Sequence, residues 1–102
     1  MSQFEDRERA FEAKYAHDQE MQFKAEARRN KLLGLWAAAL IGHADPDAYA
    51  LEVVKADFEE AGDEDVFRKL AGDLGDKATE GEIRAVMKDK MVEAKQQLMS
   101  EV

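Results

Sequence analysis

The stretch Lys31-Leu-Leu-Gly-Leu-Trp-Ala-Ala-Ala-Leu-Ile41 is followed by Gly42-His-Ala-Asp45-Pro46, and together they predict two helices joined by a short turn. Gly42 stands where a helix would end, because glycine readily adopts the left-handed conformation that follows a last helical turn. Asp45 and Pro46 have the residue types of an N-cap and a first helical position. The apolar residues of the stretch form one wide helical face: Leu32, Leu33, Leu35, Trp36 and Leu40.

Upstream of this stretch, the helical pattern extends back to Ser2 without a breaker. Ser2 and Glu5 have the spacing of a capping box, in which each side chain accepts from the other residue's backbone N–H. The apolar face near the N-terminus does not continue, since its next positions are Asp18 and Gln22. We therefore expect a structural change near residues 17–22: a bend, a fray, or a passage from order to disorder.

Downstream, three further helices are predicted. One runs from Pro46 to about residue 60, with Leu51, Val54 and Phe58 on one face and Tyr49 and Val53 on a second. The next follows Asp63 as N-cap and ends at Gly75. The last starts at a capping box of Thr79 and Glu82, fades near Ser100, and has a core stripe of Ile83, Met87, Ala94 and Leu98.

These segments predict an all-α fold: a small four-helix bundle with a partly ordered N-terminal helical arm. We divide the chain into an arm, residues 1–20, and a helical body, residues 21–102. Small residues at Gly34, Ala38 and Gly42 mark one face of the first helix. Such a face suits close packing against another helix, within the chain or from a partner, and we favour packing within the chain.

The charge is divided unevenly between the two ends of the sequence. Residues 1–31 carry seven acidic and seven basic residues, so the formal net charge of −8 comes entirely from the rest of the chain. A body this acidic argues against nucleic acid and against anionic membrane surfaces as partners. No secretory signal is present, and the longest apolar run, Leu35 to Ile41, is too short to span a bilayer. We expect a cytoplasmic protein without direct membrane insertion.

The sequence offers few groups for catalysis or metal binding. It has no cysteine and two histidines, His17 and His43, which are too far apart to form a local ligand pair. The acidic segment Asp57–Asp65 lacks an EF-hand calcium loop's ligands, because Ala61 and Arg68 occupy the fifth and twelfth positions. The segment Gly72–Lys77 lacks the spacing of a phosphate-binding loop, so we interpret it as a turn. We expect neither an enzyme nor a metal site.

The N-terminal arm has the pattern of a helix that binds a partner. Phe4, Phe11 and Tyr15 are spaced seven and four residues apart, which on an α-helix places them within an arc of about 40°. Charges of both signs surround this arc, the basic ones being Arg7, Arg9 and Lys14. Recognition of a helix by a groove uses such anchor spacing. The alternative is a charged tail without a partner, which is common at chain ends.

Four blocks of sequence lie between residues 6 and 70: Asp6–Asp18 (DRERAFEAKYAHD), Phe23–Ala38 (FKAEARRNKLLGLWAA), Tyr49–Glu60 (YALEVVKADFEE) and Gly62–Leu70 (GDEDVFRKL). They closely resemble the alphaproteobacterial family of ATPase inhibitor zeta subunits. The resemblance implies a four-helix domain with a mobile N-terminal region. It also implies binding to the F1 part of ATP synthase and inhibition of ATP hydrolysis. The N-terminal region would enter an interface of the alpha, beta and gamma subunits.

This resemblance makes residues 2–18 the expected inhibitory arm, with Phe4, Arg7, Arg9, Phe11, Lys14 and Tyr15 as its binding residues. It also implies weak adenine-nucleotide binding at a site that cannot be assigned, and no required cofactor. We expect a monomer when the protein is free and a peripheral position on the membrane-bound synthase when it is engaged. The alternative is a small nucleotide- or ligand-binding helical domain with a passive tail. A coiled-coil oligomer through the first helix is less favoured, because sustained heptads are missing between residues 15 and 32.

Overall fold

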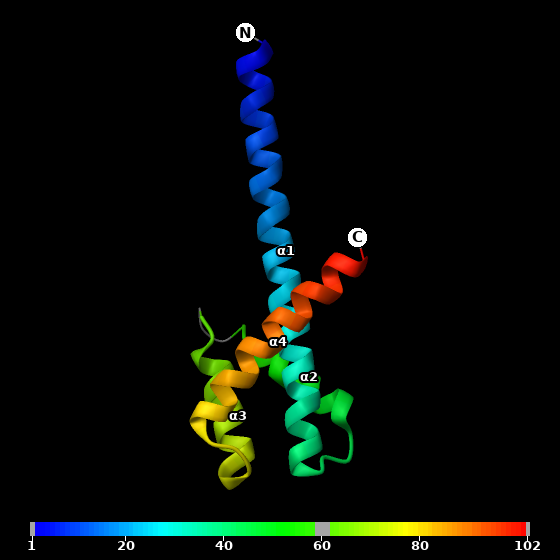
Figure 1. Ribbon diagram of the computed structural model, residues 1–102, viewed down its shortest axis with the longest axis vertical. Coiled ribbons are helices and arrows are strands. Elements are labelled where there is room, and N and C mark those ends of the chain that lie inside the picture. Colours follow the sequence, from blue (N-terminus) through cyan, green and yellow to red (C-terminus); the bar gives the residue numbers. More distant parts are fainter. Residues whose placement is uncertain (1, 59–61, 102) are drawn as a thin grey trace.

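The computed structural model describes residues 2–58 and 62–101 of the chain, with side chains described from residue 18 onward. Within these residues the chain forms α1 (Ser2–Ile41), α2 (Pro46–Ala56), α3 (Glu64–Leu74), a 3-10 turn η1 (Gly75–Lys77) and α4 (Glu80–Glu101). The predicted all-α fold with four helices is confirmed. The molecule is elongated, with principal extents of 62 × 27 × 23 Å, because α1 projects far beyond the other helices (Figure 1).

Helix α1 is continuous through the segment where we expected a structural change. It runs as one helix from Ser2 to Ile41, so neither a break nor a second start occurs at residues 17–22. Its N-terminal part extends away from the body, and its C-terminal part lies between α2 and α4 (Figure 1). Among the described side chains, the first buried one is Ala25. In the described part of α1, burial therefore starts just after the segment where the sequence pattern changes.

Most helix ends follow the predicted capping signals. Gly42 ends α1 with a φ of 63°, a left-handed conformation that costs glycine little. The Asp45 carboxylate accepts from the Ala48 N–H at 3.2 Å and caps α2. At the start of α4, the Thr79 hydroxyl accepts from the Glu82 N–H and donates to the Glu82 carboxylate, both at 3.1 Å. The Ser2 capping box lies outside the described side chains.

One predicted helix end is wrong, and one predicted cap lacks its bond. Helix α2 ends at Ala56 rather than near residue 60, whereas Asp63 is the N-cap of α3 as predicted but makes no side-chain capping bond. The reason is that the carboxylates on either side of this connection bond to α1 instead. Asp57 accepts from Asn30 and Asp63 accepts from Arg29. A charge-assisted bond to a buried guanidinium is stronger than an exposed cap, so the tertiary contact determines where Asp63 points.

The core is built from one face of each helix around the lower half of α1. The four-residue core stripe predicted for α4 is buried as expected. In α2 the second predicted face is the core face, with Tyr49 and Val53 buried, whereas Leu51 and Phe58 are 53% and 68% exposed. The cluster of buried residues comprises Leu33, Ala37, Ala38, Tyr49, Val53, Val66, Phe67, Leu70, Leu74, Ala78, Ile83 and Met87, with Trp36 half-buried against it.

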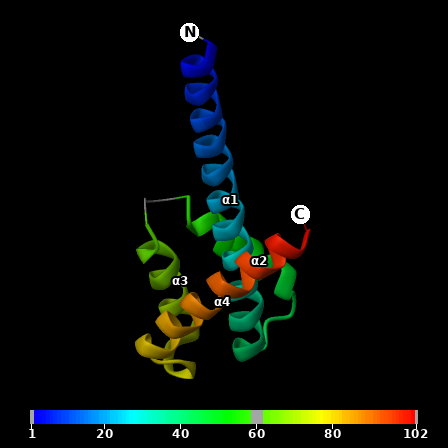
Figure 2. The same ribbon diagram turned by 45° about the horizontal axis from the view of Figure 1, so that its top comes forward.

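Helix α4 crosses α1 obliquely, and both views show this crossing (Figures 1 and 2). Arg28 of α1 bonds to both carboxylate oxygens of Glu101 at 2.7 and 3.1 Å and to Gln97 at 3.0 Å. The C-terminal end of α4 is thereby attached to α1 immediately below the projecting arm.

Candidate functional site

The six predicted binding residues all lie on the projecting part of α1. Phe4, Arg7, Arg9, Phe11, Lys14 and Tyr15 fall within the backbone range Ser2–Ile41 of this helix, and their side chains lie outside the described ones. Their grouping on one arc remains a prediction from helical spacing.

The base of the arm is held by a buried polar network between α1 and the α2–α3 connection. Arg29 and Asn30 are 3% and 1% exposed. The Arg29 guanidinium donates to Asn30 at 3.0 Å and to Asp63 at 2.9 Å, and the Asn30 amide donates to Asp57 at 3.0 Å. Both carboxylates thus tie the connection to the helix that carries the arm.

This network carries no orphaned group in the described part of the chain. There, every buried side-chain nitrogen and oxygen has a hydrogen-bond partner. Burial raises the pKa of Asp57, and it outweighs the Asn30 hydrogen bond and the Arg29 charge, which lower it. Asp57 and Asp63 therefore have a structural role, as hydrogen-bond acceptors for α1. Among the described residues no three His, Cys, Asp or Glu side chains are grouped for a metal ion.

A second polar cluster joins α2 to α3. The Tyr49 hydroxyl donates to Asp73 at 2.8 Å, and Lys69 donates to the same carboxylate at 3.0 Å. The Lys69 ammonium also lies 5.1 Å from the centroid of the Tyr49 ring. Burial and the hydrogen bond to Asp73 raise the pKa of Tyr49 well above its usual range. This cluster stiffens the body at a distance from the arm.

An open groove of about 560 Å³ runs along α1 below the arm, between α2 and α4. Its apolar lining includes Phe23 and Leu98, and its cations are Lys24, Arg28 and Lys31. The Phe23 ring is 58% exposed and packs against Phe58 with ring centroids 6.3 Å apart. An aromatic surface beside cations suits a ligand with a flat ring and a negative group.

Sequence reasoning did not find this groove. The two apolar faces of the second predicted helix were recognised, but periodicity alone did not indicate which face is buried. The unburied face supplies Val54 to the groove and places Phe58 against Phe23. One feature of the sequence could have indicated the groove. The second predicted helix has more apolar positions than one core face needs.

In the described part of the chain, no helix combines the length and apolar character needed to cross a membrane. The fold and the arm define a class: a small helical protein whose compact body supports one long projecting helix. The family profile of ATPase inhibitor subunit zeta matches residues 1–97, and the chain belongs to this family. A search among curated proteins found no match to the chain.

Proposed function

We propose that this protein inhibits ATP hydrolysis by F1F0-ATP synthase by inserting its N-terminal helix at an interface of the alpha, beta and gamma subunits of F1. Membership of the ATPase inhibitor zeta family supports an inhibitory role. The observation that carries the mechanism is the shape of the molecule, in which one helix belongs to the body at one end and projects from it at the other (Figure 1). The body is too wide to follow this helix into a narrow groove, so it would remain outside.

The body acts as a stop and the arm as the inserted element. The described core starts at Ala25, so the projecting part of α1 is available for a partner without loss of body packing. In the engaged state, Phe4, Phe11 and Tyr15 bury their rings in an apolar groove, while Arg7, Arg9 and Lys14 pair with acidic groups of F1. The protein itself is a regulator and not an enzyme. It is a cytoplasmic monomer when free and peripheral on the membrane-bound synthase when engaged.

The test is a titration of cognate F1-ATPase with the full-length protein and with Phe4→Ala/Phe11→Ala/Tyr15→Ala. Truncation of one aromatic hot-spot anchor typically costs about 2 kcal/mol or more, so the concentration for half-inhibition should rise at least about 30-fold even if a single one of the three rings dominates binding. Leu51→Ala is the matched control, since Leu51 is an exposed apolar residue of the body. Equal inhibition by the triple variant and the unmodified protein refutes insertion of the aromatic arc.

A second candidate function rests on the groove beside Phe23. The ring of Phe23 would stack on an adenine base, and Lys24 and Lys31 would face its phosphates, beside Arg28, which pairs with Glu101 of the same groove. Titration with ATP and ADP, followed by backbone chemical shifts, tests this site. Saturable shifts at residues 21–31 that disappear in Phe23→Ala support it, and shifts spread evenly over the body exclude it.

A further inference from the structure

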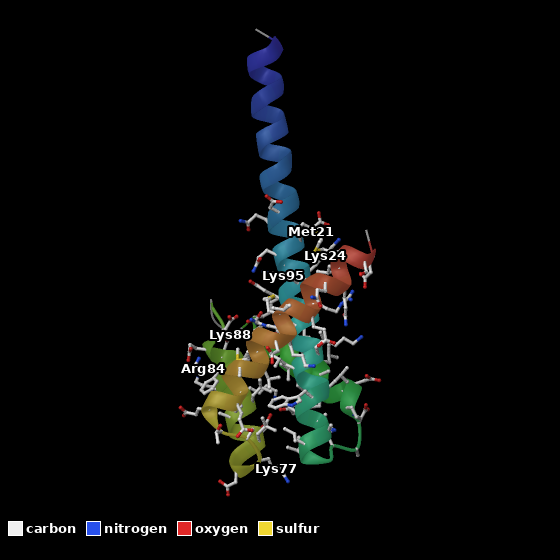
Figure 3. All side chains as sticks on the ribbon, in the orientation of Figure 1. Met21, Lys24, Lys77, Arg84, Lys88 and Lys95 are labelled. Carbon is white, nitrogen blue, oxygen red and sulfur yellow. The ribbon has the colours of Figure 1, made fainter. Side chains whose placement is uncertain are left out.

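One flank of α4 joins cations to exposed apolar side chains in an otherwise acidic body. Positions 84, 88, 92, 95 and 99 follow one another at spacings of four, four, three and four, so they form one stripe along the helix. Val92 and Met99 on this stripe are 57% and 75% exposed. Figure 3 shows the labelled Arg84, Lys88 and Lys95 in succession along α4. We call residues Arg84, Lys88, Val92, Lys95 and Met99 the α4 stripe.

The charges of the α4 stripe are of one sign. On α4 the acidic residues between positions 81 and 99 are Glu82, Asp89 and Glu93, which lie about 100–140° away from the centre of the stripe. Lys88 and Lys95 have no ion pair or hydrogen bond among the described residues. Arg84, in contrast, bonds to Glu64 at 3.1 Å and stacks on the Phe67 ring at 3.9 Å. Two exposed cations of this surface are therefore free to meet an external acid.

The C-terminal end of the stripe opens into an apolar groove of about 230 Å³ at the crossing of α4 and α1. The walls of this groove bring Met21 of α1 together with Leu98 and Met99 of α4. Methionine side chains adapt their shape to a partner, which suits a docking surface. Lys95 and Gln22 lie at the same groove, where Asp18 is the one acidic residue among the described lining side chains.

We propose that the α4 stripe, with the groove at its end, docks an acidic amphipathic helix of the ATPase, as a second contact besides the arm. The proposal rests on the proposed function, and it names the surface through which the body would hold the enzyme. Its basis is charge complementarity: the formal net charge of −8 opposes association of two copies of the chain, while the cationic stripe attracts a local acidic surface. The stripe spans sixteen residues of helix, about 22 Å from the first to the last, which matches the length of a four-turn partner helix.

The arm and the α4 stripe have different effects on inhibition. The arm blocks turnover once it is inserted, and the α4 stripe raises the local concentration of the arm at its groove by holding the body nearby. Loss of the stripe therefore weakens binding but leaves the maximal inhibition at saturation unchanged. Loss of the arm removes the inhibition itself.

The test compares Lys88→Glu/Lys95→Glu with Lys55→Glu/Lys77→Glu in the full-length protein. All four lysines are exposed, and both variants change the net charge equally, so long-range repulsion affects them alike. Inhibition of cognate F1-ATPase is measured as a function of protein concentration at two salt concentrations. We expect the half-inhibition concentration of the first variant to rise at least about ten-fold, with weaker salt dependence, and that of the control less than about three-fold.

The results separate this inference from the proposed function. Failure of the unmodified protein to inhibit would reject the proposed function itself. If the unmodified protein inhibits and the two double-lysine variants have equal half-inhibition concentrations, docking through the α4 stripe is rejected and the proposed function is not. Circular dichroism melting checks that both variants keep the fold. Val92→Ser/Met99→Ser is an independent variant without a charge change, and we expect its half-inhibition concentration to rise several-fold.

The occupant is identified by crosslinking. Because the chain has no cysteine, Met99→Cys provides one site for a photoreactive thiol reagent. A crosslink to an acidic helical peptide of F1 supports the proposal, provided that Lys77→Cys yields no such product. A crosslink to a second copy of the chain, or sedimentation with vesicles of phosphatidylcholine and phosphatidylserine that is lost in Lys88→Glu/Lys95→Glu, would overturn it.

Discussion

Gly34 of α1 lies so close to Ala50 of α2 that a Cβ atom at position 34 would come within 2.4 Å of the Ala50 Cα. The obstacle is backbone as well as side chain, so the two helices would have to separate. The small-residue face of the first helix therefore serves packing within the chain at Gly34, as favoured from sequence.

Replacement of Gly34 by alanine should destabilise the body by about 1–3 kcal/mol, the usual cost of overpacking a core contact. Gly72→Ala is the matched control, because Gly72 is helical and has open space around it. That change should stabilise the protein by about 0.5–1 kcal/mol through helix propensity. Urea unfolding of both variants measures the difference, and a stable Gly34→Ala protein would contradict the close contact.

Asn30 bonds to two partners in the buried network, so its replacement should remove two hydrogen bonds. Asn30→Ala leaves Asp57 without its donor and Arg29 without one acceptor, at a cost of about 1–3 kcal/mol. Gln22→Ala is the control, since among the described residues Gln22 bonds to Glu26 alone, in an exposed contact on the same helix. Equal unfolding free energies for the two variants would show that the network does not hold the α2–α3 connection.

The Asp73 cluster predicts a pH dependence of stability. Burial alone would raise the pKa of Asp73, but hydrogen bonds from Tyr49 and Lys69 and the Lys69 charge lower this pKa below its usual value. A carboxylate whose pKa is lower in the folded state stabilises the fold at pH values above its pKa in the unfolded state. This stabilisation is lost as the pH falls through its pKa in the folded state. Asp73→Asn should therefore cost about 0.5–1 kcal/mol at pH 7, a value reduced for solvent exposure, and the cost should shrink below about pH 4.

Thermal unfolding of Asp73→Asn and the unmodified protein between pH 2 and pH 7 measures this change. The exposed carboxylate of Asp76 supplies the control, because it has no partner among the described residues, and Asp76→Asn should show no such convergence. A stability difference that stays constant down to pH 2 would contradict the assigned direction for Asp73.

The continuity of α1 predicts that the arm and body act as one helix. Gln19→Pro would remove a backbone hydrogen bond and bend the helix between them, at about 3 kcal/mol. We expect up to about 100-fold weaker inhibition of F1-ATPase, a lower helical signal in circular dichroism, and an unchanged body core. Gln19→Ala should behave like the unmodified protein. Full inhibition by Gln19→Pro would favour a flexible junction instead.

Local signals in the sequence were sufficient for much of the fold. The glycine after Ile41, the Asp45-Pro46 start and the Thr79–Glu82 pair depend on neighbours within four residues, and each signal correctly indicated a helix end. The α4 core stripe follows from helical periodicity alone. These features involve no competition from distant residues.

The errors arose where distant residues compete. Asp63 has the residue type of a cap, but Arg29, which is 34 positions away, binds its carboxylate. Which face of α2 is exposed, and whether a groove forms beside Phe23, depend on the side of α2 that packs against α1. Helical spacing gives two faces of similar apolar content and no rule for choosing between them.

In the proposed mechanism, the N-terminal arm is the part of the protein that inhibits the ATPase. The direct measurement is ATP hydrolysis by cognate F1 with the full-length protein and with a chain lacking residues 1–18, after thermal melting has established that the shortened chain is folded. We predict that the full-length protein inhibits hydrolysis and that the folded, shortened chain does not. Full inhibition by the shortened chain would contradict the account.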